Sequence, residues 1–240
     1  IVARGNVNVT GPWRLGLKGI TFMFDHPWDY QRGLRVTSSG FFNATNTTMF
    51  SIHSNGATMN RYLYDIDYST VDMIDCNLLN TGSSGIDSYY SIVNLTRTNI
   101  TTDKNYCIDS YYSTLRIERC NFKGATEYAI YSRNGYNTLR NSTFAQCYYG
   151  FYSYQSTKAW VERTNFTGMM SYSVYADYSA LTVKNVTITK SGDGMRLYYS
   201  SAVMDNVYYH NCTSTGINVY YNPSTLTISK SRFENCSGGV

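Results

Sequence analysis

Charged residues make up only 15% of this 240-residue chain, and its formal net charge is +4. The lysines and arginines are scattered, so the sequence lacks the clustered basic surface that binds nucleic acid or an anionic membrane. It also lacks any apolar run near the length that spans a bilayer. We therefore expect neither a nucleic-acid partner nor membrane insertion. The sequence shows no initiator methionine and no signal peptide, so we expect a processed chain or a piece of a longer one.

Helical periodicity and metal-binding motifs are missing as well. No ten-residue stretch repeats its apolar residues every 3.6 positions, which argues against a helical solenoid. The six cysteines form no Cys-x-x-Cys or Cys/His spacing typical of zinc, and the three histidines (His26, His53 and His210) are far apart in the sequence. Tyrosine, in contrast, is abundant, with 25 residues. Such a composition favours aromatic surfaces that keep a polar hydroxyl in water.

The clearest signal is an internal repeat. The segment Ile86–Ser91 (IDSYYS) returns unchanged at Ile108–Ser113, and weaker copies continue to the end of the chain. A period of about 22 residues indicates a stacked-repeat architecture. A leucine-rich repeat has a similar period, but its pattern places leucine two residues after asparagine. Here the apolar residue follows asparagine directly, as in Asn121-Phe122.

Aligning the repeats predicts three short parallel strands in each coil. Apolar residues alternate with polar ones, and equivalent residues should stack about 4.8 Å apart. We expect one domain over residues 1–240, with irregular coils in 1–63 and eight regular coils in 64–240. No polar capping segment ends the repeats, so we expect the solenoid to be part of a longer chain. Three columns should face inward; one of them contains Leu78, Ile100, Phe122, Phe144 and Phe166.

This repeat resembles the right-handed parallel β-helix superfamily, which includes pectate-lyase-like and NosD-like proteins. The resemblance rests on the pattern of Ile, Ser, Leu-x-Ile and Asn-Phe in successive coils, and it covers about three quarters of the chain. It implies an all-β right-handed solenoid. Lyases, epimerases, phage tailspikes, adhesins and inert fibres share this fold, so the resemblance does not identify an activity. It also implies a structural ladder of stacked asparagines at Asn77, Asn99, Asn121 and Asn165, interrupted by Thr143.

Outward positions of the first strand are the candidate site. Asp65, Asp87 and Asp109 should stack about 5 Å apart, where a cation, tyrosine hydroxyls or proton uptake must relieve their repulsion. The resemblance implies calcium binding or acid–base catalysis for such carboxylates, with Arg133 as a further catalytic candidate. No histidine falls near this column, so an assembled catalytic group is missing and a non-enzymatic role is favoured. We expect no cofactor apart from Ca²⁺ at these three aspartates.

The rest of this face is predicted to be a strip of tyrosines. Such a strip either stacks for stability or binds a sugar chain or a second solenoid. The candidate binding residues are Tyr89, Tyr111, Tyr131, Tyr152, Tyr154, Tyr175, Tyr198 and Tyr220.

Sequons and cysteines give further predictions. Cys212 and Cys236 share a column on adjacent coils, within the range of a disulfide. Asn99 and Asn165 are sequon residues inside the predicted ladder, so we expect them to carry no sugar. The other sequons are candidate glycosylation sites: Asn8, Asn43, Asn46, Asn94, Asn141, Asn185, Asn211 and Asn235.

These observations favour an extracellular or cell-surface structural or adhesive glycoprotein, a building block of a fibre or appendage. Its expected partners are other solenoid subunits or glycans. The alternative is a carbohydrate-active enzyme, meaning a polysaccharide lyase, an epimerase, a hydrolase or a tailspike-like depolymerase, or else a carbohydrate-binding module. The residues from Asp65 to Arg133 on the first-strand face would then carry the activity.

Overall fold

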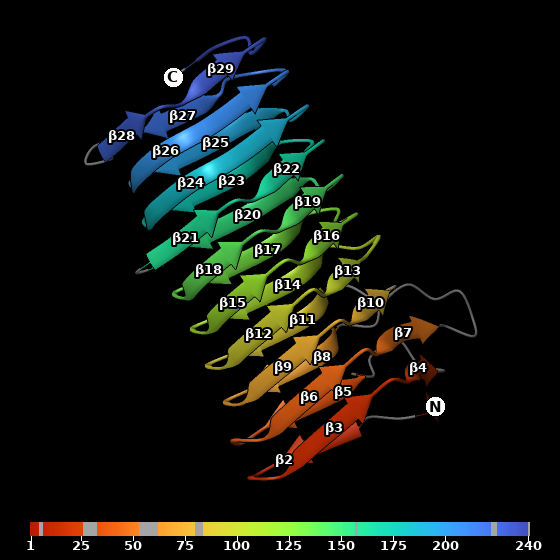
Figure 1. Cartoon of the computed structure of the whole chain (residues 1–240). Coiled ribbons are helices and arrows are strands. Elements are labelled where there is room, and N and C mark those ends of the chain that lie inside the picture. Colours follow the sequence, from red (N-terminus) through yellow and green to blue (C-terminus); the bar gives the residue numbers. More distant parts are fainter. Residues whose placement is uncertain are drawn as a thin grey trace.

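The computed structural model describes residues 1–4, 7–25, 33–52, 62–79, 84–156, 158–221 and 225–239. In this part of the chain every regular element is a β-strand, and the strands wind into a solenoid whose coils stack from the N-terminal to the C-terminal end (Figure 1). No described helix is long and apolar enough to cross a membrane. The prediction of an all-β solenoid with about 22 residues per turn is therefore confirmed.

Each coil contributes a first, a second and a third strand. The first strands form a ten-stranded parallel sheet, the first sheet. Its strands are β2 (Val7–Thr10), β5 (Leu34–Thr37), β8 (Tyr62–Asp67), β11 (Ser84–Tyr89), β14 (Tyr106–Tyr111), β17 (Tyr128–Arg133), β20 (Tyr149–Tyr154), β23 (Tyr172–Asp177), β25 (Asp193–Tyr198) and β27 (Ile217–Tyr220).

The second and third strands belong to one continuous 19-stranded sheet, because they fuse into single strands near the C-terminal end. The fused strands are β24 (Ala180–Thr189) and β26 (Ser201–His210). The separate second strands are β3 (Arg14–Lys18), β6 (Phe41–Thr45), β9 (Thr70–Ile74), β12 (Ile92–Thr96), β15 (Thr114–Glu118), β18 (Tyr136–Arg140), β21 (Lys158–Glu162) and β28 (Thr225–Ser229). The separate third strands are β4 (Thr21–Asp25), β7 (Thr48–Ile52), β10 (Asn77–Leu79), β13 (Asn99–Thr101), β16 (Asn121–Lys123), β19 (Thr143–Ala145), β22 (Asn165–Thr167) and β29 (Arg232–Glu234), and β1 (Val2–Ala3) pairs with β4.

The register of the repeat matches the sequence alignment. Ile86, Ile108 and Ile130 are successive Cα partners in the first sheet. Leu78, Ile100 and Phe122 are partners in the third strands. All of these side chains are at most 1% exposed, so the predicted inward columns form the core.

Aromatic stacking continues through this core. The rings of Phe122 and Phe144 lie 4.8 Å apart, and those of Phe144 and Phe166 lie 4.7 Å apart. Both pairs are close to parallel, as a 22-residue register with equivalent rotamers requires. The stacked rings therefore pack three neighbouring coils against one another.

The asparagine ladder is confirmed in part. Asn99 donates a hydrogen bond to Asn77 at 2.7 Å and accepts one from Asn121 at 2.7 Å. Asn165 stands in the same column, but its neighbour there is Thr143, and its own side chain is exposed. The ladder therefore ends before Asn165, and the structural reason for excluding sugar at that asparagine does not hold.

The first coils are more regular than predicted. Leu34 pairs with Val7 on one side and with Tyr64 on the other, although these partners are 27 and 30 residues away in the sequence. The second and third strands of these coils are also in register with those that follow. The extra residues fall between a third strand and the next first strand, so the described parts of residues 1–63 belong to the same stack.

Candidate functional site

Half-buried tyrosines cover the outward face of the first sheet between β14 and β25. In β14, Cys107 and Ile108 are both buried, and this break in the alternation turns Tyr106 to the same side as Asp109 and Tyr111. The same pattern recurs in the following strands. We call this surface the tyrosine face. It consists of Tyr106, Tyr128, Tyr131, Tyr149, Tyr152, Tyr172, Tyr175, Asp109, Arg133, Asp177 and Arg196.

The rings of the tyrosine face pack directly on one another. The centroid of Tyr128 lies 4.6 Å from that of Tyr149 and 5.2 Å from that of Tyr152. Tyr152 stacks in turn on Tyr175 at 4.4 Å and contacts Tyr131 at 5.1 Å. These contacts hold the rings in place along the axis of the solenoid, so the surface is arranged before any ligand arrives.

Asp109 lies at the N-terminal end of the tyrosine face, beside Glu127. Burial, and secondly the negative charge of Glu127, raise the pKa of Asp109 to about 7. Burial, followed by a hydrogen bond with Glu127, raises the pKa of Tyr106 above its ordinary value. A large fraction of Asp109 is therefore protonated near neutral pH, which suits a proton donor.

Asp177 lies further along the face and interacts with Tyr152. The hydroxyl of Tyr152 donates a hydrogen bond to Asp177 Oδ2 at 3.0 Å. Burial, and then the charge of Asp177, raise the pKa of Tyr152 well above its usual range. Asp177 is only 8% exposed, and its burial raises its own pKa although the bond from Tyr152 opposes that change.

Two arginines lie against the aromatic rings. The guanidinium of Arg133 lies 5.2 Å from the ring centroid of Tyr154. The guanidinium of Arg196 lies 5.0 Å from Tyr175 and 4.8 Å from Tyr220. Cation–π contacts of this kind orient a guanidinium while leaving some of its N–H groups available.

Several polar atoms of the tyrosine face are buried without a hydrogen-bond partner among the described residues. Four of the six such atoms in the described chain belong to this surface. Each costs about 1–3 kcal/mol while it stays unsatisfied, so a cluster of them points to a functional surface. They are two acceptors and two donors: Asp109 Oδ1, Asp177 Oδ1, Arg133 Nε and Arg196 Nε.

The predicted acidic column is present, but it does not form a calcium site. Asp65, Asp87 and Asp109 are successive Cα partners in the first sheet. Arg35, the partner of Asp65 on the preceding strand, places its Nε 3.3 Å from Asp65 Oδ2 and its Nη2 3.7 Å from Asp67. No group of three or more His, Cys, Asp or Glu side chains within the described ranges could hold a metal ion. Arg35 supplies positive charge to Asp65 at one end of the column, whereas Asp109 at the other end has a raised pKa instead.

The predicted tyrosines divide into two groups. Tyr131, Tyr152 and Tyr175 form the centre of the tyrosine face, with Tyr111 and Tyr154 beside it. Tyr89 and Tyr198 lie toward the corner that follows the first strand, where Tyr89 contacts Tyr90 and Tyr198 contacts Tyr199. Tyr220 contacts Arg196 at the C-terminal end of the face.

A whole column of the face was missed by the sequence analysis. It contains Tyr106, Tyr128, Tyr149 and Tyr172, which are register partners or stacked neighbours. Their spacing of 21 to 23 residues was visible in the sequence, but strict alternation would have placed them on the inward face, since each stands two residues before an inward residue such as Ile108. Only the two consecutive buried residues in each strand turn them outward.

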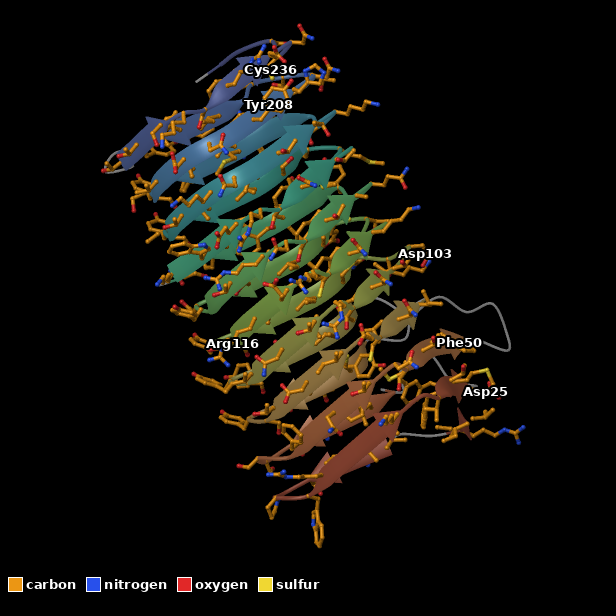
Figure 2. All side chains as sticks on the ribbon, in the orientation of Figure 1. Asp25, Phe50, Asp103, Arg116, Tyr208 and Cys236 are labelled. Carbon is orange, nitrogen blue, oxygen red and sulfur yellow. The ribbon has the colours of Figure 1, made fainter. Side chains whose placement is uncertain are left out.

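Cys212 and Cys236 lie on adjacent coils as predicted, and they contact one another through their thiols. Both are free cysteines in this structure, so the predicted disulfide is not formed. Burial, and secondly the neighbouring Cys236, raise the pKa of Cys212 to about 12, which keeps it protonated. Cys236 lies at the C-terminal end of the solenoid (Figure 2).

Most of the eight predicted glycosylation sites share a backbone property. Five of them adopt a left-handed backbone with φ between 49° and 55°. Asparagine tolerates this conformation better than most residues, so coil geometry alone accounts for its presence there. Glycosylation of the eight sequons stays a prediction. The five are Asn46, Asn141, Asn185, Asn211 and Asn235.

Comparison with known proteins places this geometry in context. A double mutant of a periplasmic alginate epimerase is similar with a TM-score of 0.54 at 11% identity, covering 97% of this chain and 78% of that one. The catalytic domain of an α-1,3-glucanase variant in complex with nigerose is similar with a TM-score of 0.50 at 8% identity, covering 99% of this chain and 62% of that one. No curated protein matches the sequence significantly.

At these identities the structural neighbours show a common fold and no common activity. The family described as the right-handed beta helix region matches residues 106–240, which is more than half of the chain. That match, the parallel sheets and the 22-residue register lead to one assignment. The chain belongs to the right-handed β-helix family.

Proposed function

We propose that the tyrosine face binds a saccharide chain that lies along the axis of the solenoid. The observation that carries this proposal is the set of four unpartnered polar atoms within a wall of stacked rings. Through the atoms that solvent reaches, the carboxyl groups beside them can accept hydrogen bonds from sugar hydroxyls, and the guanidinium groups can donate to sugar oxygens. The ring faces offer the apolar surface on which a sugar packs.

The arrangement also supports a carbohydrate-active enzyme. Asp109, whose pKa lies at about 7, is the proposed proton donor, and Asp87 on the adjacent strand is the proposed second carboxylate. Adjacent strands lie about 4.8 Å apart, and retaining glycosidases hold two carboxyl groups about 5–5.5 Å apart. By their names, the two solved neighbours are an epimerase of alginate and a glucanase, which supports a polysaccharide as the substrate class.

The test is a binding and turnover screen of the full chain against alginate, pectate and α-1,3-glucan. Calorimetry measures binding, and reducing-end release together with proton NMR of the polymer measures hydrolysis, elimination or epimerisation. We expect Asp109→Asn to keep binding and to lower turnover at least a hundredfold. We expect Tyr152→Ala to lower affinity about tenfold, since it removes the central stacked ring.

Asp103→Asn is the matched control, because the Asp103 side chain is 77% exposed and lies outside the tyrosine face. It should leave both readouts unchanged. If none of these polymers binds, or if Asp109→Asn and Tyr152→Ala behave like the control, the tyrosine face has another role.

A location outside the cytoplasm belongs to the same proposal. The epimerase neighbour is described as periplasmic, and many sequons of this chain are exposed. Extracellular or cell-surface secretion, and contacts with glycans or other solenoid subunits, would agree with a polysaccharide ligand. A role as a fibre building block stays a prediction from the sequence, because none of the contacts described above favours it.

A further inference from the structure

A second polar surface lies on the outward face of the second strands, away from the tyrosine face. There a groove of about 760 Å³ runs over β12, β15 and β18, and we call it the second-strand groove. Arg116 stands on the middle strand of the three and lies on this flank of the solenoid (Figure 2). The groove contains Asn94, Thr96, Thr114, Arg116, Glu118, Tyr136, Thr138 and Arg140 among its lining residues.

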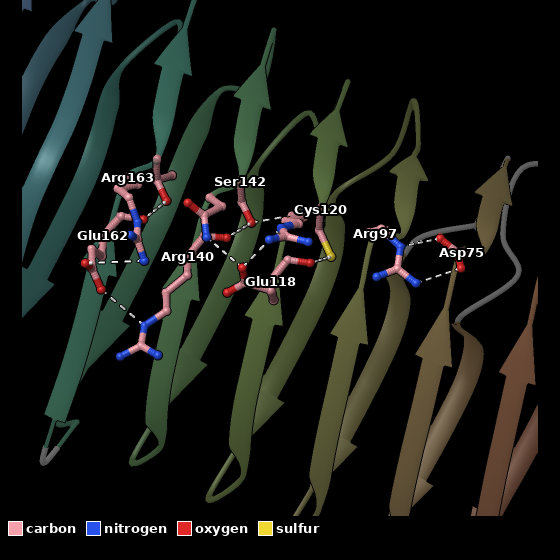
Figure 3. A network of polar contacts seen from close by, with 11 residues as sticks. Asp75, Arg97, Glu118, Cys120, Arg140, Ser142, Glu162 and Arg163 are labelled. Atoms are coloured by element: carbon pink, nitrogen blue, oxygen red, sulfur yellow. Dashed lines mark hydrogen bonds and ion pairs between the residues drawn. The ribbon is translucent and has the colours of Figure 1, made fainter.

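Most charges around the groove are already neutralised. Arg140 Nε lies 3.2 Å from Glu162 Oε2 (Figure 3). Glu118 accepts a hydrogen bond from Asn141 at 2.6 Å and lies 3.6 Å from Arg119. Both carboxylates at the rim therefore have their own partners.

Arg116 differs from these residues. Its Nη1 lies 3.4 Å from the side-chain oxygen of Asn94, a neutral acceptor. No carboxylate of the described chain lies within ion-pair distance of it. Arg116 therefore presents a guanidinium without a counterion to the groove, and a planar guanidinium favours carboxylate or sulfate oxygens.

Aromatic rings and a second cation border the same groove. Lys158 Nζ lies 5.5 Å from the ring centroid of Tyr136 and 5.6 Å from that of Trp160. Tyr136 is 41% exposed, and Trp160 is the register partner of Thr138 in the lining. An exposed ring beside hydroxyl and amide groups suits a sugar, and the two cations add a preference for negative charge.

We propose that the second-strand groove binds an acidic saccharide, with Arg116 and Lys158 holding the anionic group and Tyr136 receiving the sugar ring. Nucleic acid also combines anions with stacking, but it requires a continuous basic track. Here Glu118 and Glu162 alternate with Arg140 along the edge of the groove. This site does not depend on the function of the tyrosine face.

The experiment titrates the full chain with four probes of matched length or charge. They are a uronate oligosaccharide, a sulfated oligosaccharide, a neutral oligosaccharide and a single-stranded oligonucleotide, with inorganic sulfate as a fifth, minimal probe. Calorimetry gives the affinity. We expect at least one acidic saccharide to bind, and Arg116→Gln and Lys158→Gln each to weaken it about tenfold. The comparison of uronate with sulfate identifies the anionic group.

Arg163→Gln is the matched control, since Arg163 is exposed on the same flank but does not line the groove. Arg133→Gln separates the two sites, because it removes a cation from the tyrosine face alone. Melting temperatures show whether each variant is folded. Three results would overturn the proposal. Neutral and acidic saccharides could bind equally well, or the oligonucleotide could bind more strongly than either. Alternatively, binding could be lost in Arg133→Gln but kept in Arg116→Gln.

Discussion

Single residues at the corner after the first strand carry an unusual conformation. Tyr68, Tyr90 and Tyr112 have φ values of 48°, 47° and 51°, in the left-handed region that bulky side chains rarely adopt. The ring of Tyr90 stacks on that of Tyr68 at 5.2 Å and on that of Tyr112 at 4.7 Å. The stacking of one ring pair and the strain of one left-handed residue are of similar size, about 1 kcal/mol each. The stacked rings therefore offset the free-energy cost of the left-handed backbone.

Removing one of these rings should therefore expose the strain. We expect Tyr90→Ala to lower the free energy of unfolding by about 1–3 kcal/mol, measured by urea denaturation, since two stacked pairs are lost. Gln155→Ala is the control, because Gln155 has the same backbone conformation (φ 49°) and no stacked neighbour ring among the described residues. An equal loss in both variants would mean that the side chain at the corner matters less than the backbone.

Asp109 gives a prediction about pH. Its pKa of about 7 in the folded chain lies above the ordinary value, so the folded state binds the proton more tightly than the unfolded chain. Its contribution to stability therefore falls as pH rises from about 4 to 7. We expect Asp109→Asn to raise the free energy of unfolding at pH 8 by about 1–2 kcal/mol, less than the full shift implies because solvent reaches part of the group.

Urea denaturation at pH 5 and pH 8 measures this effect. The difference between the variant and the original chain should be larger at pH 8. If Asp109→Asn destabilises the chain equally at both values, the carboxyl group of Asp109 makes hydrogen bonds that an amide cannot replace.

At the scale of strands and corners, hydrogen bonds repeat from coil to coil. Ser91 Oγ accepts a hydrogen bond from the backbone N–H of Ser69 at 3.1 Å, and Ser113 Oγ accepts one from Ser91 at 3.0 Å. On the neighbouring corner, Arg97 forms two hydrogen bonds with Asp75 of the preceding coil (Figure 3). Such ladders satisfy polar groups at each turn and hold the coils in register.

The asparagine ladder allows a matched comparison. Asn99 makes two side-chain hydrogen bonds, whereas Asn165 in the same column has an exposed side chain outside the ladder. We expect Asn99→Ala to lower the free energy of unfolding by about 1–2 kcal/mol and Asn165→Ala by less than about 0.5 kcal/mol. Both changes remove a sequon, so both variants are made in a host that adds no glycan. Thermal or urea unfolding measures the difference, and similar values would show that the ladder contributes little.

The strands and their register could be predicted because the 22-residue repeat determines which residues lie above one another. Ile86, Ile108 and the stacked phenylalanines follow from that spacing alone. The outward column of Tyr106 could not be predicted, since it depends on a local break in the alternation of β14. The pairing of Arg35 with Asp65 was missed because 30 residues separate them, more than one standard repeat.

At the scale of the whole molecule, the solenoid carries two separate polar walls. The tyrosine face extends over five adjacent strands from β14 to β25, a span of roughly 19 Å at the spacing of parallel strands. The second-strand groove occupies the flank formed by β12, β15 and β18. Because the coils are linked by continuous parallel sheets, each surface keeps its spacing along the axis.

The length of the tyrosine face predicts a dependence on ligand length. If a saccharide lies along this face, affinity measured by calorimetry should increase with each added sugar up to a span of roughly 19 Å and then level off. Arg196→Gln should weaken only the longer oligosaccharides, because Arg196 is on the last strand of the face. A disaccharide that binds as tightly as a hexasaccharide would instead indicate a single compact pocket.

The return from a third strand to the next first strand accepts extra length without any change of register. Leu34 and Tyr64 remain Cα partners although their segment is eight residues longer than the later repeats. Foreign peptides grafted at this connection should therefore be displayed along one edge of the rod at intervals that the coil spacing sets. Such a scaffold would present several epitopes at fixed intervals along its axis, while the tyrosine face and the second-strand groove stay unchanged.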